Sequence, residues 1–310
     1  MSDHLEFRLV DAFADGPFAG NPAGVVLGAD PLDEGQMQAI AREVNASETV
    51  FILRANDLHR PTQLRWFTPR AEVGFCGHAT LAAAHALHEA GCLDAALSKS
   101  DAKIAFESAA GTLKLHPESI PGDATALWWL RLPDPAMQPA RANPLKACEL
   151  LGMNIDDLDP AIPLMRTRDD DLILVIRSWQ RLVELRPNFS ELASWSEQNG
   201  IRGLCVATTA TLSASINVQS RFFAPALGIN EDPVTGSVHG PLAVLMVVNG
   251  LVPTASGRSA VNCIQGEPGG RTGLVRALVE SVGEAYNVSI AGRCHTTIRG
   301  EIRVPGKSSQ

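Results

Sequence analysis

The sequence predicts an α+β protein built from two similar domains. Its 310 residues are enough for about two domains. Short strand-like segments are numerous and long helices are few, without the regular strand–helix alternation of a doubly wound sheet. The stretch RWFTP at 65–69 also returns as RFFAP at 221–225. Because this offset of 156 residues is close to half the chain, we expect one fold to occur twice.

The first copy of the repeat predicts a strand, a tight bend and a helix. Residues 65–68 have the composition of a strand. Gly74 and Gly77 then permit a bend that residues with side chains resist. The segment Ala79–Leu87 is rich in alanine and leucine, which favour a helix, and we expect this helix to start at Gly77–His78.

The second copy leads through a bend at 228–237 into another apolar helix, Pro241–Asn249. A helix N-terminus offers free backbone N–H groups and a positive dipole end, which suit a carboxylate or a phosphate. If the two copies face each other, four side chains from the two bends line one cleft. They are Cys76, His78, Asp232 and Ser237.

The remaining elements follow from local signals. Asp30 as N-cap with a proline next to it starts a helix, and Asn143 starts another that stops at Gly152. A cluster of prolines places the linker between the domains at about 133–142. The expected strands are 7–13, 25–27, 50–53, 65–68, 103–107, 112–116, 125–132, 162–167, 172–176, 203–207, 216–223, 260–264, 274–279, 286–290 and 298–304, with further helices over Asp30–Val44 and 190–198.

Composition excludes several classes of protein. The net charge is −8 and no stretch concentrates Lys and Arg, so we expect no nucleic-acid partner. The six cysteines form no C-x-x-C pair, and the N-terminus lacks the charged-then-apolar pattern of a signal peptide. The longest apolar run, 242–248, is too short to span a bilayer. These features predict a cytoplasmic protein with reduced thiols and no membrane partner.

Three motif-like stretches lack the spacing that their chemistry needs. The glycine-rich segment 266–273 has no P-loop lysine, so a turn is favoured over a nucleotide site. Residues 85–89 do not form H-E-x-x-H, so no metal is implied. Residues 236–240 do not form G-x-S-x-G, and Ser237 is therefore expected to be a helix cap or an anion ligand.

Three side chains leave alternatives open. Cys76 fits either a thiol acid/base at a helix start or a small buried hydrophobe. Glu48 enters the strand 50–53, where it is either an exposed rim carboxylate or a functional acid; at the repeat offset it meets Leu204. Asp232 alone fits a cap. Beside Glu48 it completes a carboxylate pair, which proton transfer at carbon can use.

Five motifs occur in a recognisable order along nearly the whole chain. They are GNPAGVV at 20–26, SETVF at 47–51, FCGHAT at 75–80, EDPVTGS at 231–237 and QGxxxGR at 265–271. Together they resemble the PhzF family of phenazine-biosynthesis isomerases, which shares its fold with diaminopimelate epimerase. The resemblance implies two pseudo-symmetric domains, each a mixed sheet wrapped around a central helix, in a homodimer. The implied domains are 1–132 plus about 298–310, and 133–297.

The resemblance also implies a cofactor-free and metal-free site between the domains. Its catalytic residues match Glu48, His78 and Asp232. Its substrate-binding positions match Gly77, Gly236, Ser237, Cys76 and Asn21. The phenazine enzymes themselves do not carry cysteine at position 76, where the related epimerases place a catalytic thiol, and this speaks against the phenazine substrate.

The sequence thus predicts a cofactor-independent isomerase acting on a small carboxylic acid. Glu48 would remove a proton from one carbon and return it to another, while His78 and Asp232 polarise the substrate. Ser237 and the two helix starts would hold the carboxylate. Two other functions remain open: an epimerase or racemase that uses Cys76 against Asp232, and a protein that binds an anionic metabolite without turnover.

Overall fold

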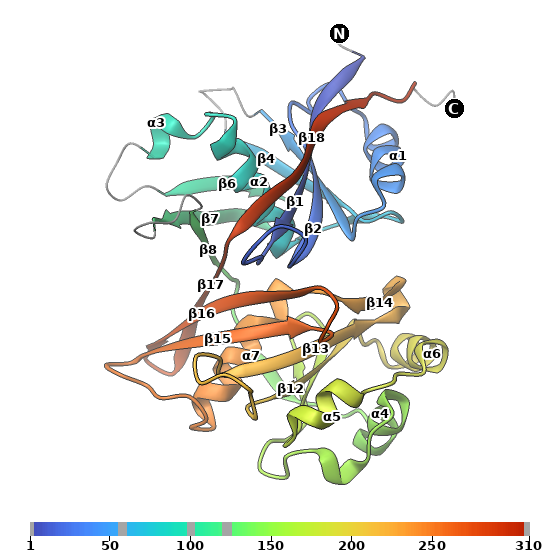
Figure 1. Cartoon of the computed structure of the whole chain (residues 1–310), viewed down its shortest axis with the longest axis vertical. Helices are drawn as coiled ribbons and strands as arrows, with labels where there is room; N and C mark the ends of the chain where they lie inside the picture. Colours follow the sequence, from blue (N-terminus) through green and yellow to red (C-terminus); the bar gives the residue numbers. More distant parts are fainter. Residues whose placement is uncertain (1–2, 55–60, 98–102, 120–125, 307–310) are drawn as a thin grey trace. The chain divides into compact units, whose positions relative to one another are not determined.

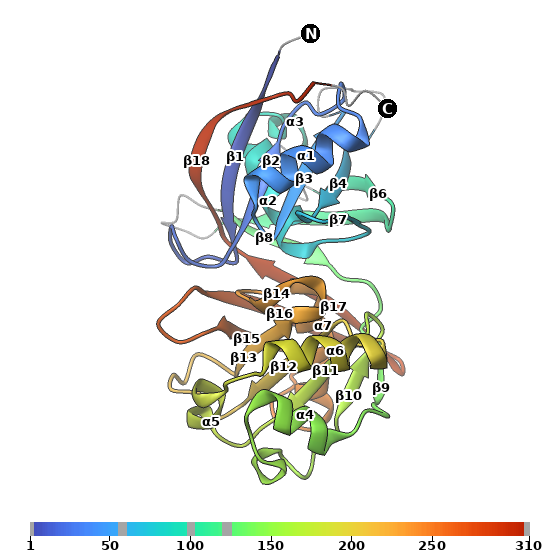
Figure 2. The same cartoon turned by 90° about the vertical axis from the view of Figure 1, so that its right-hand side faces the viewer.

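The computed structural model describes residues 3–54, 61–97, 103–119 and 126–306. By its contacts the chain forms two compact units (Figures 1 and 2): unit 1, residues 1–131 with 291–310, and unit 2, residues 132–290. The expected strand 125–132 begins at Thr125, which lies outside the described residues.

Unit 1 is a mixed sheet with one buried helix. Its elements are β1 (His4–Ala12), β2 (Asn21–Val26), α1 (Glu34–Val44), β3 (Glu48–Leu53), β4 (Gln63–Phe67), β5 (Glu72–Val73), α2 (Gly77–Glu89), α3 (Asp94–Leu97), β6 (Ile104–Ser108), β7 (Gly111–Glu118), β8 (Leu127–Arg131) and β18 (Cys294–Arg303). β1 pairs antiparallel with β2 and β18, and β2 runs parallel to β3. β4 is antiparallel to β3 and β5 and parallel to β6. Since Ala12 already pairs with Cys294, the chain re-enters unit 1 ahead of the expected residue 298.

Helix α2 is the central helix of unit 1. Every residue from Gly77 to Leu87 is buried, and the helix packs against β1, β2, β3, β8 and β18 (Figure 1). Its alanines allow strands to approach on several sides, because a methyl group takes little space. The helix begins at Gly77, which confirms the start at Gly77–His78 that the bend predicts.

Helix α1 covers the outer face of the same sheet. Met37 and Ile40 pack there against Phe51 and Phe67. The helix begins at Glu34 and not at Asp30, because Asp33 and Gln36 form a capping box that satisfies the first N–H groups.

Unit 2 repeats this arrangement. Its elements are β9 (Met137–Pro139), α4 (Pro144–Leu151), η1 (Ile155–Asp157), β10 (Met165–Thr167), β11 (Asp171–Val175), α5 (Trp179–Glu184), α6 (Phe189–Asn199), β12 (Gly203–Thr208), β13 (Val218–Ala224), η2 (Pro225–Leu227), β14 (Ile229–Asp232), α7 (Gly236–Val248), β15 (Arg258–Gly266), β16 (Thr272–Val282) and β17 (Ala285–Gly292). β11 is parallel to β12, and β13 is antiparallel to β12 and β14 and parallel to β15. This order of pairings matches that of β2, β3, β4, β5 and β6, so the fold is α+β and pseudo-symmetric, as expected.

Two sequence-based boundaries in unit 2 are wrong. The expected linker 133–142 contains β9, which pairs with β10, because prolines are tolerated in an edge strand. The expected helix Pro241–Asn249 begins at Gly236 and has Pro241 in its interior. A proline there removes one helical hydrogen bond. The burial of nearly all of the first three turns of α7 offsets that loss.

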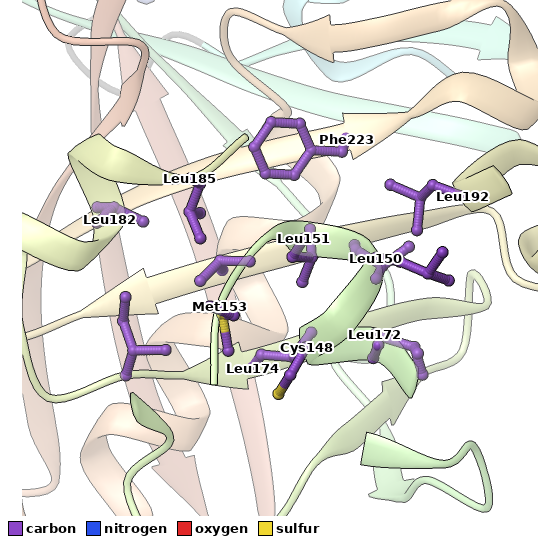
Figure 3. Packing of buried hydrophobic residues seen from close by; sticks show 14 of the residues in the cluster. Cys148, Leu150, Leu151, Met153, Leu172, Leu174, Leu182, Leu185, Leu192 and Phe223 are labelled. Carbon is purple, nitrogen blue, oxygen red and sulfur yellow. The ribbon is translucent and has the colours of Figure 1, made fainter. Parts of the chain in front are cut away.

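One hydrophobic cluster of unit 2 lies between its sheet and three helices. Leucines of α4, α5 and α6 pack against β11 and against Phe223 of β13 (Figure 3). Helices α4 and α6 also contact each other (Figure 2). Cys148 lies within this cluster, where burial raises the pKa of its thiol to about 11, so it is a packing residue.

Among the helices of the described residues, none is both long and apolar enough to cross a bilayer.

Candidate active site

Three elements of unit 1 bring polar side chains to one place. Asn21 is the first residue of β2, Glu48 is the first residue of β3, and the parallel pairing of these strands keeps the two ends adjacent. His78 lies in the first turn of α2, which packs against both strands. Gly20 has φ +63°, and a Cβ there would lie 2.2 Å from the carbonyl oxygen of Ala12, so the approach to Asn21 requires glycine.

His78 is the centre of this cluster, which we call the unit-1 site: Asn21, Ser47, Glu48, Cys76 and His78. Its Nε2 lies 3.3 Å from Oε2 of Glu48 and 3.4 Å from Oγ of Ser47. Its Nδ1 lies 3.4 Å from Nδ2 of Asn21 and 3.4 Å from Sγ of Cys76. The side chains of His78 and Glu48 are 6% and 16% exposed, so the pair is shielded from solvent without being sealed from it.

The hydrogen bonds indicate which nitrogen of His78 carries the proton. Ser47 donates its hydroxyl proton to Oδ1 of Asn21 over 3.0 Å, which directs the amide Nδ2 toward His78. An amide nitrogen only donates, so Nδ1 of His78 accepts and Nε2 holds the proton in the neutral ring. Nε2–H then faces the Glu48 carboxylate.

Cys76 differs from the cysteines buried in the core. It is the residue before α2, and its side chain makes no cap hydrogen bond with that helix. Its Sγ contacts His78 instead. In contrast, burial raises the pKa of the Cys263 thiol to about 12, so that thiol stays protonated. Cys76 is buried, and its role as an acid/base stays a prediction.

Asp232 is a buried acid of unit 2. Thr235 donates from Oγ1 to Oδ2 of Asp232 over 2.6 Å. Gln265 donates to the backbone oxygen of Asp232 over 2.8 Å and accepts from the N–H of Thr235 over 3.1 Å. Gln265 is followed by Gly266 at φ +121°, where a Cβ would lie 2.2 Å from the carbonyl oxygen of Arg271. Asp232, Thr235, Ser237 and Gln265 form what we call the unit-2 site.

Both central helices begin at these sites. Gly77 and Gly236 are the first residues of α2 and α7, and neither helix has an acidic residue in its first turn or a side-chain cap hydrogen bond. The first-turn N–H groups of each helix are therefore suited to an anion. Ser237 is the second residue of α7 and Thr235 precedes the helix, so the expectation that Ser237 is the cap is wrong. The hydroxyl of Thr235 does not cap the helix because it is bonded to Asp232.

With this geometry in place, comparison with known proteins decides the family. The sequence profile of the PhzC-PhzF family, described as phenazine biosynthesis-like proteins, matches residues 10–300. The chain belongs to the PhzC-PhzF family. An uncharacterised isomerase of Clostridium acetobutylicum is 32% identical over 296 residues, which cover 94% of this chain and 96% of that protein. This chain is an isomerase of the same family.

Solved structures agree with the fold. The PhzF-family phenazine biosynthesis protein of Bacillus anthracis superposes with a TM-score of 0.85 at 26% identity, covering 97% of this chain and 99% of that one. A probable proline racemase from Agrobacterium radiobacter superposes with a TM-score of 0.63 at 11% identity, covering 98% and 94%. At that identity the second comparison shows the fold alone, which this PhzC-PhzF protein shares with racemases and epimerases.

The strand ladders correct one detail of the repeat in this PhzC-PhzF protein. Thr49 pairs with Phe67, and Leu204 pairs with Phe223. Because the two phenylalanines are equivalent in the repeat, Glu48 corresponds to the glycine before Leu204 and not to Leu204 itself. The second unit still carries no acid at this place, so the carboxylate belongs to unit 1 alone.

The same register identifies Arg202, which the sequence did not single out. Arg202 corresponds to Ser47, and Ser237 corresponds to His78 as the second residue of its helix. Within each unit the two residues are in contact. Ser47 contacts His78, and Arg202 donates from Nη2 to Oγ of Ser237 over 2.9 Å. A guanidinium has no acceptor, so the hydroxyl proton of Ser237 is left to be donated to another group. Nε of Arg202 donates to the buried Asp171 over 2.8 Å.

Asp171 and Arg202 form a partly buried ion pair whose disruption has a measurable cost. Burial raises the pKa of Asp171 and Arg202 opposes that rise. Arg202→Met leaves a carboxylate that is 1% exposed without its cation, and we expect a loss of about 3 kcal/mol in the free energy of unfolding. This value is at the lower end of the cost of removing one partner from a buried ion pair, because the Arg202 side chain is 32% exposed. Urea denaturation measures it.

The matched control for this prediction is Arg258→Met, which breaks an ion pair with Glu280 at the surface. We expect that change to cost about 1 kcal/mol or less. Equal losses in the two variants would show that Asp171 does not depend on Arg202.

His239, in the second turn of α7, predicts a pH dependence of stability. Burial lowers its pKa to about 4, although its Nδ1 donates to the backbone oxygen of Thr235 over 2.8 Å. The unfolded chain binds a proton near pH 6.5 and the folded chain does not. Stability is therefore lost as the pH falls from about 6.5 toward 4, by about 2 kcal/mol at pH 5 from this residue.

His239→Asn keeps an N–H group near the position of Nδ1 and removes the titration. We expect the wild-type protein to lose about 2 kcal/mol more than this variant between pH 7 and pH 5, measured by urea denaturation. Other titrating groups cancel in the difference. Identical losses in the two proteins would contradict the assignment of a neutral, buried His239.

Proposed function

We propose that this PhzC-PhzF protein is a cofactor-independent isomerase that moves a proton between two carbons of a small carboxylic acid. Glu48 is the general base that removes the proton and the acid that returns it. His78 orients Glu48 and polarises the substrate. The single observation that carries the proposal is the Glu48 carboxylate, 16% exposed and 3.3 Å from Nε2 of His78.

The steps balance without an external reagent. A C–H bond adjacent to the substrate's conjugated carboxylate breaks, its proton bonds to Glu48 and its electron pair delocalises toward the carboxylate oxygens. The backbone N–H groups that start α2 and α7, together with the Ser237 hydroxyl, stabilise this negative charge. Glu48 then returns the proton to a different carbon, and the double bond shifts between them.

Asp232 is proposed as the second acid/base in the same reaction. Its bond from Thr235 fixes one carboxylate oxygen, so the other is the one offered to substrate. The order of the motifs, the repeated helix starts and the family assignment support this assignment of roles.

Solvent exchange tests the proposal without knowledge of the natural substrate. A panel of small saturated and unsaturated carboxylic acids is incubated with the protein in deuterium oxide and analysed by NMR. Deuterium at a carbon next to the conjugated system, with a shifted double bond in the same acid, supports an isomerase. Saturable binding of acids without deuterium in any of them indicates a binding protein and contradicts the proposal.

An epimerase is the second candidate, because Sγ of Cys76 lies 3.4 Å from Nδ1 of His78. In that reaction Cys76 and Asp232 would exchange a proton at one stereocentre. Cys76→Ala separates the two candidates: it abolishes epimerisation, whereas isomerisation by Glu48 continues. Deuterium at a stereocentre with loss of optical rotation, and no double-bond shift, would favour the epimerase.

We further propose that the protein works as a homodimer in the cytoplasm. The free cysteines fit a reducing compartment. The net charge of −8 does not favour a nucleic-acid partner. Sedimentation equilibrium measures the assembly, and a monomer at micromolar concentration would contradict this part of the proposal.

A further inference from the structure

The unit-1 site brings together three kinds of metal-binding atom. A carboxylate oxygen of Glu48, Sγ of Cys76 and a ring nitrogen of His78 all lie within 4.8 Å of one another. Among the residues that the structure describes, this is the one group of three His, Cys, Asp or Glu side chains whose possible ligand atoms lie that close together. Carboxylate, thiolate and imidazole are the ligands that zinc takes from proteins, and three of them leave a fourth position open.

The distances approach those of a tetrahedral zinc site. With ordinary zinc–ligand bond lengths, a nitrogen and an oxygen ligand lie about 3.3 Å apart, and a nitrogen and a sulfur ligand about 3.5 Å apart. Nε2 of His78 lies 3.3 Å from Oε2 of Glu48 and 4.0 Å from Sγ of Cys76. An inward movement of the thiol by about half an ångström brings Sγ to that distance from Nε2, and the Glu48 oxygen and Sγ already lie within 4.8 Å of each other.

Asn21 and Ser47 can support this ligand set. A histidine that binds metal through Nε2 carries its proton on Nδ1 and donates it to a neighbouring acceptor. Asn21 lies at Nδ1, and a turn of its amide presents Oδ1 to that proton. The amide Nδ2 then faces the Ser47 hydroxyl, which accepts as readily as it donates. The contacts of Asn21 with His78 and Ser47 therefore rearrange, while metal bonds replace the contact of Nε2–H with Glu48.

We propose that Glu48, Cys76 and His78 bind one zinc ion, or a similar divalent ion, and that this ion inhibits the isomerase. Binding releases the thiol proton of Cys76, moves the His78 proton from Nε2 to Nδ1 and takes Glu48 as a carboxylate. Two anionic ligands offset the charge of the ion. The inhibitory part rests on the proposed function, because a Glu48 oxygen bonded to metal no longer accepts a proton from carbon.

Cobalt(II) is the probe for the binding part, since its spectrum reports its ligands. Full-length protein, treated with a chelator and kept reduced, is titrated with cobalt chloride and then with zinc chloride. We expect one equivalent of cobalt to give intense tetrahedral bands and a thiolate-to-cobalt charge-transfer band, and zinc to displace it. No saturable band at one equivalent overturns the proposal.

Variants locate the site. Cys76→Ser removes the charge-transfer band, and Asn21→Leu weakens zinc binding by about 10- to 100-fold while the band remains, as loss of a supporting residue does. The matched control is Cys92→Ser, which changes the exposed cysteine of the same unit and leaves spectrum and affinity unchanged. A band that survives Cys76→Ser, or that disappears with Cys92→Ser, overturns the assignment. Circular dichroism confirms that each variant is folded.

The proposed inhibition by zinc is tested separately, by measuring deuterium exchange into substrate with and without one equivalent of zinc. Because the cobalt spectrum needs no substrate, a failure of the proposed function leaves the binding result intact. We expect zinc to stop exchange in the wild-type protein and a chelator to restore it. Undiminished exchange in the zinc-loaded protein overturns the claim of inhibition.

Discussion

Glu48→Gln is expected to lower the isomerisation rate constant kcat by about a thousandfold, within the range that a general base supplies. Glutamine has nearly the same shape and still accepts from Nε2 of His78, the contact that holds Glu48 at 3.3 Å. It does not accept a proton from carbon. We therefore expect substrate affinity, measured by calorimetry, to change much less than kcat.

The control for this variant is Glu43→Gln, which removes an exposed carboxylate from α1 in the same unit. We expect wild-type kcat and affinity from that protein. If Glu48→Gln weakens substrate binding strongly while kcat stays near the wild-type value, then Glu48 positions the substrate and is not its base.

Asp232→Asn is expected to lower kcat by about a hundredfold or more. The asparagine oxygen still accepts from Oγ1 of Thr235, and Gln265 bonds to the backbone at this position, so the local structure is preserved. What is lost is the negative charge and the ability to transfer a proton. Steady-state kinetics at saturating substrate measures the change.

The control for Asp232→Asn is Asp134→Asn, which removes an exposed carboxylate of the same unit. Its kcat should equal that of the wild type. Wild-type kcat in Asp232→Asn would show that the unit-2 site only binds the carboxylate. Thr235→Val removes the hydrogen-bond donor to Asp232 and leaves the acid in place without a fixed orientation. Its kcat should lie between those of the wild type and Asp232→Asn.

The unit-1 site was largely predictable from the sequence. The predicted Glu48, Cys76, His78 and Asn21 lie together in the structure. They were predictable because each stands in a sequence motif at the start of a strand or a helix, and each motif can be identified by itself. The sequence places Ser47 in a motif but assigns it no role. Its role depends on a hydroxyl that contacts both Asn21 and His78, which is a matter of side-chain direction.

The contacts of the unit-2 site are not predictable from the sequence, because the partners are distant along the chain; Gln265 stands in a motif, but no pattern links it to Asp232. Gln265 reaches Asp232 from β15, and Arg202 reaches Ser237 from the segment before β12. No local pattern links such pairs. The repeat itself was the available signal: aligned by strand pairing, it sets Arg202 opposite Ser47 at the equivalent helix start.

Element boundaries show the same division between local and tertiary causes. The start and end of α4 at Asn143 and Gly152 followed from caps that act locally, and both are as predicted. Gln36, the third residue of α1, signals the capping box of Asp33, a clearer start than the proline beside Asp30. Pro241 within α7 was not predictable, because the tertiary packing of a buried helix overrides the local preference of proline.

The proposed isomerase reaction requires the Glu48 carboxylate to take a proton from a carbon of a small acid. It is tested most directly by the deuterium content of acid recovered from deuterium oxide, with the wild-type protein and Glu48→Gln treated side by side. We predict label in the acid recovered from the wild type and none above background in the acid from the variant. Equal label in the two samples would contradict the claim.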